Sequence, residues 1–264
     1  MRPWFLGVIV SVLCSFFWAG AQNPKEGAKK AVEPKILLVD RWPLPNSWPK
    51  DGAKLTLRGM ALESIEKAEA LSKDGKDGKD GKTIALKIGQ KEKSAPPANR
   101  EALEAGDSQI ELQWPNGSQA PSTIRFHSKG LPKPVDFAVT ETPLAVQNEK
   151  EPNGGFEEAQ KCLPGQLMLG SISPVKDVDV FALQSPKGSR TLFLTGPKGP
   201  QMTLLRPYFM LHNAQGDLVK AFEWDRNQEM GIPWEGGKPY FLSIIDQLDS
   251  TSGFHHYAFQ VEFR

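Results

Sequence analysis

The chain ends in a run of strictly alternating side chains, "HHYAFQVEF". Every second residue is large and apolar, and the residues between are small or polar: Tyr257, Phe259, Val261 and Phe263 against Ala258, Gln260 and Glu262. Successive side chains of a β-strand point to opposite faces, so this pattern predicts a strand over 255–263 with one buried face. Burying the four large side chains would contribute about 6–12 kcal/mol before entropy costs. The C-terminus therefore closes a hydrophobic core.

Shorter alternating runs recur from residue 36 onward. The 264 residues include 24 Gly and 22 Pro, a mixture that favours many short strands joined by turns. "NAQGD" at 213–217 is one such predicted hairpin turn. The predicted strands are 36–40, 54–58, 83–88, 109–114, 123–127 and 135–140, followed by 166–172, 178–184, 191–195, 208–213, 218–224, 240–246 and 255–263. We therefore predict an all-β chain with two β-sandwiches in tandem.

The first 21 residues have the pattern of a signal peptide. Arg2 precedes the apolar run "FLGVIVSVLCSFF", and the small residues 19–21 offer a cleavage point before Gln22. The alternative is a transmembrane anchor, but the run is short and polar sequence follows at once. We expect a signal peptide over 1–21, a flexible spacer over 22–34, and a secreted or periplasmic protein with no membrane span after cleavage.

Charge and cysteine content restrict the partners and the stabilising bonds. Cleavage removes Arg2, so the balance of 32 basic and 31 acidic residues becomes 31 against 31. A neutral exported chain offers no electrostatic basis for binding nucleic acid. Cys162 becomes the single cysteine of the mature chain, which rules out an internal disulfide, and we predict that it is a small buried side chain.

One stretch of the first half departs from the strand pattern. "MALESIEKAEALSKDG" has a helical composition, and "KDGKDGKDGK" follows at 73–82 as a three-residue repeat. Three triplets without proline are too few for a collagen helix, and their acidic spacing differs from that of calcium loops. We interpret 60–82 as a solvated loop insertion with one or two helical turns, at a hairpin tip.

The first half resembles the immunoglobulin-like TIG/IPT family. The resemblance lies in "PKILLVDRWPLPNSWPKDGAKLTLRGMAL" and in "PNGSQAPSTIRFHS". It implies an immunoglobulin-like β-sandwich over 35–142 that acts as a spacer or a binding module. Tryptophans are numerous in the chain, and either core packing or a peptide- or sugar-binding surface would account for Trp42 and Trp48 in the proline-rich turn.

The second half resembles the bacterial pre-peptidase C-terminal (PPC) domain. The shared motifs are, in order, "EKEPNGGFEEAQ", "GSISPVKDVDVFAL", "YFMLHNAQGDLV", "GKPYFLSIIDQ" and "YAFQVEF". This resemblance covers about 147–264 and implies a jelly-roll-type β-sandwich over 143–264. Members of the family are appended to secreted proteases and other exported proteins, where they bind substrates or surfaces or are trimmed after secretion.

The segment "NEKEPNGG" places an oxygen-bearing side chain at every second position, namely Glu149, Glu151 and Asn153. In an extended segment such side chains lie about 6.5–7 Å apart on one face. Two carboxylates held there would repel each other by about 2–3 kcal/mol. A calcium ion removes that repulsion and takes six to eight oxygen ligands, of which these residues could supply three or four.

Asp177 and Asp179 in "KDVDVF" are the obvious further donors, because they lie at the start of a predicted strand. The PPC resemblance implies that this pair meets the acidic segment at one calcium site, with the ligands Glu149, Glu151, Asn153, Asp177 and Asp179. The chain has Gly154 and Gly155 where such members often carry another acidic residue. The alternative is that both glutamates are solvated and Asn153 caps a turn or a short "FEEAQ" helix.

No sequence motif of an enzyme is evident. The chain contains no Gly-x-Ser-x-Gly elbow, no His-Glu-x-x-His helix and no phosphate-binding glycine loop. His255 and His256 are adjacent in a strand and point to opposite faces, so they cannot hold one ion together. Asp246 or Asp249 could approach a histidine as a catalytic or zinc pair, but we expect an exposed imidazole at the start of a strand.

These observations predict a non-enzymatic binding or adhesion protein. Its sandwich surfaces would bind an extracellular polysaccharide, a protein or a component of the cell envelope, and calcium would stabilise it. The alternatives are an accessory or targeting protein of an exported protease, and a structural spacer in a surface assembly.

Overall fold

The computed structural model describes residues 31–40, 53–71, 83–115, 122–139, 145–196, 202–224 and 229–264. Contacts divide the chain into Met1–Lys30 and Ala31–Arg264, and every described residue belongs to the second unit. The predicted signal peptide, most of the predicted spacer, Trp42, Trp48 and the 73–82 repeat lie outside the described residues. Within the described segments, no helix has the length and apolar character needed to cross a membrane.

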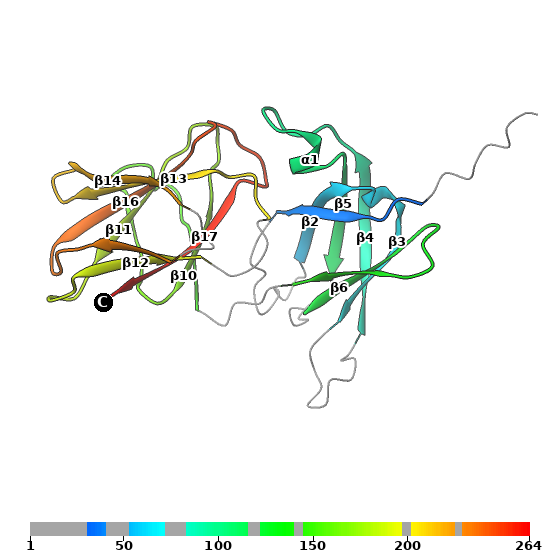
Figure 1. The fold of residues 1–264 in the computed structure, drawn as a ribbon, viewed down its shortest axis with the longest axis horizontal. Helices are drawn as coiled ribbons and strands as arrows, with labels where there is room; N and C mark the ends of the chain where they lie inside the picture. The colour runs from blue at the N-terminus through cyan, green and yellow to red at the C-terminus, as the bar shows by residue number, and fades with distance from the viewer. Residues whose placement is uncertain are drawn as a thin grey trace, which may run out of the picture. The chain divides into compact units, whose positions relative to one another are not determined.

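Strands make up almost all of the regular structure in the described part of the chain, as predicted. The first seven form one antiparallel sheet in the order β1-β2-β5-β4-β3-β6-β7, and Figure 1 shows β2 to β6 side by side. Their bounds are β1 Lys35–Val39, β2 Ala53–Met60, β3 Ile65–Leu71, β4 Thr83–Lys93, β5 Ser108–Trp114, β6 Thr123–Ser128 and β7 Val135–Ala138.

Strand β4 serves both halves of this sheet. Its first residues, Thr83 to Leu86, pair with β3, and its later residues, Lys87 to Lys93, pair with β5. Side chains from β2, β3, β5 and β6 then share one core, in which Leu55, Ile110 and Ile124 are fully buried. The expected immunoglobulin-like domain is therefore, in its hydrogen bonding, one continuous sheet around a core.

The expectation of a loop over 60–82 is wrong for its first half. Leu62–Ser64 form a single 3₁₀ turn, η1, and Ile65–Leu71 form β3, an interior strand paired on both sides. Ala68 and Ala70 are buried in the core. Pairing with β4 and β6 thus prevails over a composition that favours helix, since strand formation depends strongly on tertiary context.

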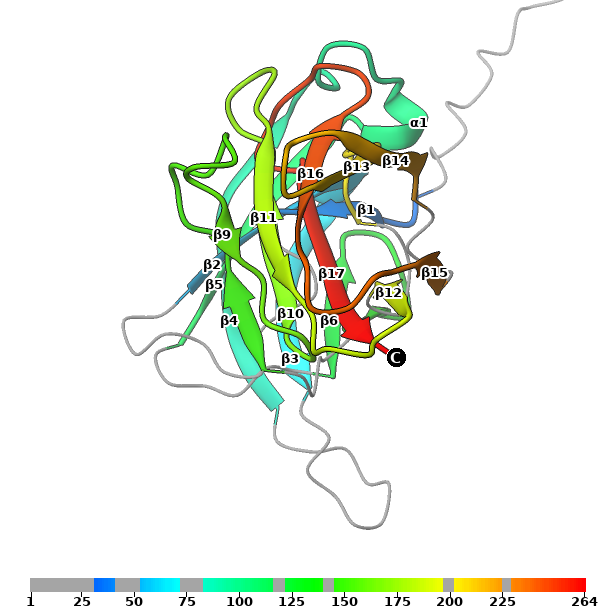
Figure 2. The same ribbon diagram turned by 90° about the vertical axis from the view of Figure 1, so that its left-hand side faces the viewer.

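The remaining strands form two five-stranded sheets, ordered β15-β12-β17-β10-β8 and β14-β13-β16-β11-β9. Figure 2 shows β11, β16 and β17 running through this part of the chain. Their bounds are β8 Val146–Asn148, β9 Gln160–Lys161, β10 Leu167–Ser171, β11 Asp179–Gln184, β12 Thr191–Thr195, β13 Pro207–Asn213, β14 Leu218–Glu223, β15 Met230–Pro233, β16 Pro239–Asp246 and β17 His256–Phe263. The single α-helix in the described residues is α1, Ala102–Ala105.

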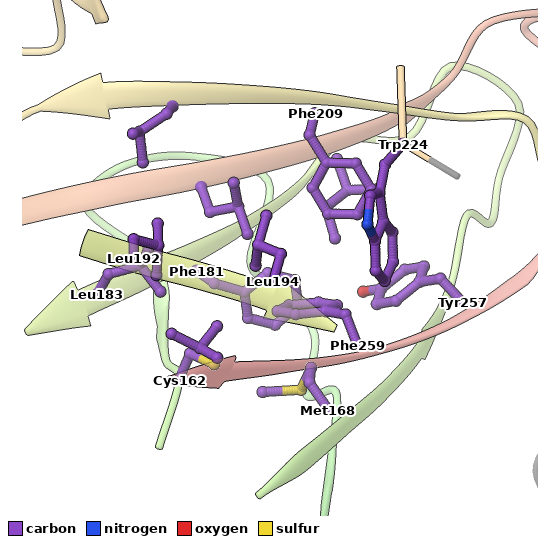
Figure 3. Packing of buried hydrophobic residues seen from close by; sticks show 14 of the residues in the cluster. Cys162, Met168, Phe181, Leu183, Leu192, Leu194, Phe209, Trp224, Tyr257 and Phe259 are labelled. Atoms are coloured by element: carbon purple, nitrogen blue, oxygen red, sulfur yellow. The ribbon is translucent and has the colours of Figure 1, made fainter. Parts of the chain in front are cut away.

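A common core joins these two sheets into a sandwich. Figure 3 shows Phe181 and Phe209 of one sheet and Phe259 of the other gathered in it. The rings of Phe181 and Phe259 meet edge to face, with centroids 5.4 Å apart, and Phe209 meets Phe259 in the same way. This is the arrangement that aromatic quadrupoles favour.

Several predictions about single residues are confirmed in this core. Tyr257, Phe259 and Val261 of the last strand are buried, and Phe263 packs against them. Cys162 is buried and free. The tryptophans among the described residues are also buried, Trp224 and Trp234 in this core and Trp114 in that of the first sheet.

The "NAQGD" turn is confirmed as well. The Asn213 amide donates to the Asp217 carbonyl oxygen at 3.0 Å, and Gly216 adopts a φ of 87°, a value that favours glycine. Strands β8, β9 and β15 were not predicted. They contain only two to four residues each, too few for a period-two pattern to be recognised in the sequence.

Candidate metal centre

The acidic segment passes from one sheet of the sandwich to the other. Strand β8 pairs in parallel with β10, and the Glu149 amide extends this pairing by donating to the Leu169 carbonyl oxygen at 2.8 Å. Four residues later, the Asn153 carbonyl oxygen accepts a hydrogen bond of 2.9 Å from the Val180 amide in β11. The side chains between these two attachments are therefore held where the sheets meet.

This path brings three carboxylates together. Each of Glu149, Glu151 and Asp179 offers an oxygen, and these oxygens all lie within 4.8 Å of one another. Asp179 is fully buried, Glu149 is half-buried and Glu151 is exposed. The group therefore has a buried floor and one side open to solvent.

Asn153 completes the group and is fully buried. Its Nδ2 donates to Glu149 Oε1 at 3.3 Å, which places the amide against the carboxylates. Its Oδ1 and the Oδ1 of Asp179 are both buried and have no hydrogen-bond partner. Buried polar atoms in proteins are normally satisfied, so two unsatisfied oxygens beside two further carboxylates indicate a site that favours a cation. We call Glu149, Glu151, Asn153 and Asp179 the acidic site.

Main-chain amides fix both glutamates of the acidic site. The Ser171 amide donates to Glu149 Oε2 at 2.7 Å, and the Asn153 amide donates to Glu151 Oε2 at 2.9 Å. Hydrogen bonds from backbone amides to carboxylates are strong and directional. The oxygens are therefore placed before any ion binds.

The electrostatics of the acidic site disfavour its negative charge. Burial, followed by the neighbouring Glu149 carboxylate, raises the pKa of Asp179 to about 9. Burial also raises the pKa of Glu151, and the like charges of Asp177 and Glu149 act in the same direction. Both effects penalise ionised carboxylates, and a bound cation would reverse them.

Asp177 is the predicted ligand that the structure does not bring into the group. Its Oδ2 accepts the Ser173 amide at 2.8 Å, and its Oδ1 accepts the Val178 amide at 2.9 Å. The side chain therefore shapes the loop before β11. Its charge still raises the pKa of Asp179.

The alternative, in which both glutamates are solvated and Asn153 caps a turn or a helix, is wrong for Asn153, because its buried Oδ1 accepts no hydrogen bond. Glu151 is exposed, as that alternative expects, whereas Glu149 is half-buried. Residues 156–158, within the "FEEAQ" stretch, form a turn. No regular helix begins there among the described residues. Glu149, Glu151, Asn153 and Asp179, all predicted from the sequence as ligands, thus lie where the two sheets of the sandwich meet.

The donor set determines which ions fit. All the donors are carboxylate or amide oxygens, the hard ligands that Ca²⁺ and Mg²⁺ prefer, without nitrogen or sulfur. The four residues supply four oxygens, or more where a carboxylate binds through both, and water can complete the six to eight that Ca²⁺ takes. Mg²⁺ usually keeps several waters and binds to one or two carboxylates, so this set of protein ligands favours calcium.

His255 lies in a separate buried network, and the expectation of an exposed imidazole at this strand start is wrong. His255 is fully buried and His256 is 6% exposed. Ser250 Oγ donates to Asp246 Oδ2 at 2.7 Å and lies 2.9 Å from His255 Nε2. The Ser250 hydroxyl has a single proton, which it donates to Asp246. Nε2 of His255 must therefore carry the imidazole proton and donate a hydrogen bond to Ser250 Oγ.

The second ring nitrogen of His255 is also satisfied. Nδ1 lies 2.8 Å from Ser252 Oγ, which can donate to it. Asp246 therefore does approach a histidine, with its Oδ2 4.0 Å from His255 Nε2. Asp246, Ser250, Ser252 and His255 are joined by these contacts, and Asp246 Oδ1 also accepts the Arg206 amide at 3.0 Å. The evident role of this network is therefore to fix the loop between β16 and β17.

Sequence reasoning missed two residues beside the acidic site, Gly170 and Tyr257. The Tyr257 hydroxyl donates to Asp179 Oδ2 at 2.8 Å, across 78 residues of sequence. Gly170 lies opposite Tyr257 in the β10–β17 pairing. A glycine inside a strand often marks a close approach, and this signal was available in the sequence.

A scan against protein-family models and a search of curated proteins each return no match to this chain.

Proposed function

We propose that this chain is an exported, non-enzymatic binding protein whose C-terminal sandwich is a PPC-like module stabilised by calcium. The observation that carries the calcium assignment is the acidic site. There Asp179 and Asn153 each present a buried oxygen without a hydrogen-bond partner beside Glu149 and Glu151. A divalent cation would satisfy these oxygens and offset the repulsion among three carboxylates.

The ion would connect the two sheets of the sandwich. Glu149 extends β8 in one sheet, and Asp179 begins β11 in the other. Calcium would thus stabilise the folded sandwich directly, by binding the native state and not the unfolded chain. Extracellular calcium modules have dissociation constants of about 0.1–1 mM, which is the range we expect here.

The binding role rests on the resemblance of "EKEPNGGFEEAQ" and the later motifs to the PPC family. The partner we propose is an extracellular polysaccharide, a protein or an envelope component. Affinity capture from secreted fractions and isolated envelopes, in calcium and in chelator, tests this role. A partner retained only in calcium supports it, whereas capture of nothing under either condition favours the structural spacer.

Thermal unfolding tests the calcium assignment. We expect a higher Tm in millimolar CaCl₂ than in chelator, with a smaller rise in MgCl₂. A concentration of 100 times the Kd would add about 2.7 kcal/mol to the free energy of unfolding. Asp179→Asn should abolish the calcium effect, and Glu157→Gln, a change at an exposed neighbouring carboxylate, should preserve it. An unchanged wild-type midpoint in calcium would refute the assignment.

A further inference from the structure

Tyr257 occupies a fixed place between the core and the acidic site. Its side chain is 3% exposed, and its ring packs edge to face against Phe181, with centroids 6.2 Å apart. Phe259 packs against the same ring at 6.0 Å. Because both neighbours are themselves fully buried, the ring cannot turn away without opening the core.

The hydroxyl at the end of this ring acts on one oxygen of Asp179. It donates to Oδ2 at 2.8 Å, and Oδ1 has no hydrogen-bond partner. A phenol has one proton to donate, so only one of the two oxygens of Asp179 receives a hydrogen bond from Tyr257. Oδ2 is held by the protein, and Oδ1 is left for a ligand.

The absence of a side chain at Gly170 leaves room for both the Tyr257 hydroxyl and the Glu149 carboxylate. A Cβ atom at position 170 would lie 2.2 Å from the Tyr257 hydroxyl oxygen and 2.6 Å from Glu149 Oε2. Both distances are shorter than non-bonded contacts allow. The next residue, Ser171, donates its amide to the same Glu149 oxygen. Only glycine at position 170 therefore admits both groups at this edge of β10.

We propose that Tyr257 and Gly170 are positioning residues for the ion of the acidic site. Tyr257 orients Asp179 so that Oδ1 alone faces the ion, and Gly170 makes room for the hydroxyl and the Glu149 carboxylate. Residues that contact the ligands of a metal without contacting the metal itself orient those ligands, and their loss typically lowers metal affinity 10- to 100-fold. This inference rests on the proposed function, since it requires that the acidic site binds an ion.

The test is calcium titration by calorimetry on the exported chain and three variants. Tyr257→Phe keeps the ring in the core and removes only the hydroxyl. We expect its calcium Kd to rise at least ten-fold and that of Gly170→Ala to rise further. The control is Tyr240→Phe, in the same sandwich, where the ring packs on Trp234 with centroids 4.0 Å apart. Its calcium Kd should equal that of the wild type.

A second measurement separates positioning from a general structural role. The Tm of each variant is compared in calcium and in chelator. If Tyr257 only supports the core, Tyr257→Phe lowers both midpoints equally and leaves the calcium-induced difference unchanged, which would overturn the inference. If Tyr257 positions Asp179, the difference shrinks.

The outcomes also distinguish the two proposals. A wild-type chain that does not respond to calcium refutes the proposed function and the inference with it. A wild-type chain that responds, together with a Tyr257→Phe variant of equal or higher affinity, refutes the inference alone. If Gly170→Ala does not fold, Tyr257→Phe still decides.

Discussion

Asn153 donates a hydrogen bond from Nδ2 to Oε1 of Glu149, at 3.3 Å, from a side chain that is fully buried. The amide thereby fixes its own orientation, because Nδ2 faces the carboxylate and Oδ1 is left without a donor. A buried amide in this orientation adds an oxygen to the acidic site without adding a fourth negative charge.

Asn153→Asp should therefore separate the metal-free protein from the calcium-bound one. In chelator the new carboxylate would be buried beside three others, and we expect the free energy of unfolding to fall by about 3 kcal/mol. In calcium the same carboxylate becomes a ligand, so the calcium-induced rise in Tm should exceed that of the wild type. Asn148→Asp adds the same charge at an exposed position and serves as the control. A variant with the wild-type calcium response would contradict the ligand role of Asn153.

The raised pKa of Asp179 predicts how metal-free stability depends on pH. The folded pKa, about 9, lies above the ordinary value of 3.8, so between these values the folded state binds more protons than the unfolded state. The stabilisation is complete below pH 3.8 and is lost as the pH rises towards 9. In chelator, the free energy of unfolding should fall between pH 7 and 9, and Asp179→Asn should show a flatter profile.

Saturating calcium should weaken this dependence, since the ion favours the ionised carboxylate. Denaturant titrations at pH 7, 8 and 9, with and without calcium, provide the measurement. Equal slopes for wild type and Asp179→Asn in chelator would show that Asp179 is ionised in the folded protein throughout this range.

His255 predicts the opposite trend at lower pH. Burial lowers the pKa of His255 from its ordinary value of 6.5, so the unfolded state binds more protons in the window below 6.5. The stability that neutral His255 contributes is present above pH 6.5 and is lost as the pH falls through the folded pKa. We expect the loss from pH 7 to 5 to be smaller in His255→Gln than in the wild type. Measuring the difference between the two proteins cancels the contribution of Asp179, and identical profiles would contradict the prediction.

Arg58 predicts a stability effect in the first sheet. Arg58 is 3% exposed. It donates to the carbonyl oxygens of Ser94, Ala95, Ala105 and Gly106, and to Ser94 Oγ. The lysine side chain has a single nitrogen, so it cannot donate to all of these acceptors at once. Arg58→Lys should therefore lower the free energy of unfolding by about 2–4 kcal/mol. Lys54→Arg at an exposed position is the control, and chemical denaturation is the measurement.

The strand pattern was readable where alternation and burial coincide. In β5, buried and partly buried residues alternate without interruption from Ser108 to Trp114, and the sequence predicts that strand within one residue. In β3 the register shifts between Ile65 and Lys67, which breaks the alternation, and the residues Ala, Glu and Lys resemble a helix. Partners far along the chain, β4 and β6, determine this strand, and a local pattern does not contain them.

The same limit applies to the acidic site. Glu149, Glu151 and Asn153 could be found from their spacing, and Asp179 from its place at a strand start, because these are local signals. The loop-forming role of Asp177 depends on its bonds to two nearby amides. The contribution of Tyr257 depends on a pairing across 78 residues. Such long-range relationships become visible only when the two sheets are in place.

The position of the acidic segment between the two sheets also has a kinetic consequence. The residues of the acidic site come together through the pairing of β8 with β10 and the place of β11 in the other sheet, which are contacts distant in sequence. We predict that these contacts form after the folding transition state, and interactions absent from that state act on the unfolding rate. Calcium should therefore shift the unfolding limb of a chevron plot and leave the folding limb in place. The ion would lengthen the lifetime of the folded protein without helping it to fold.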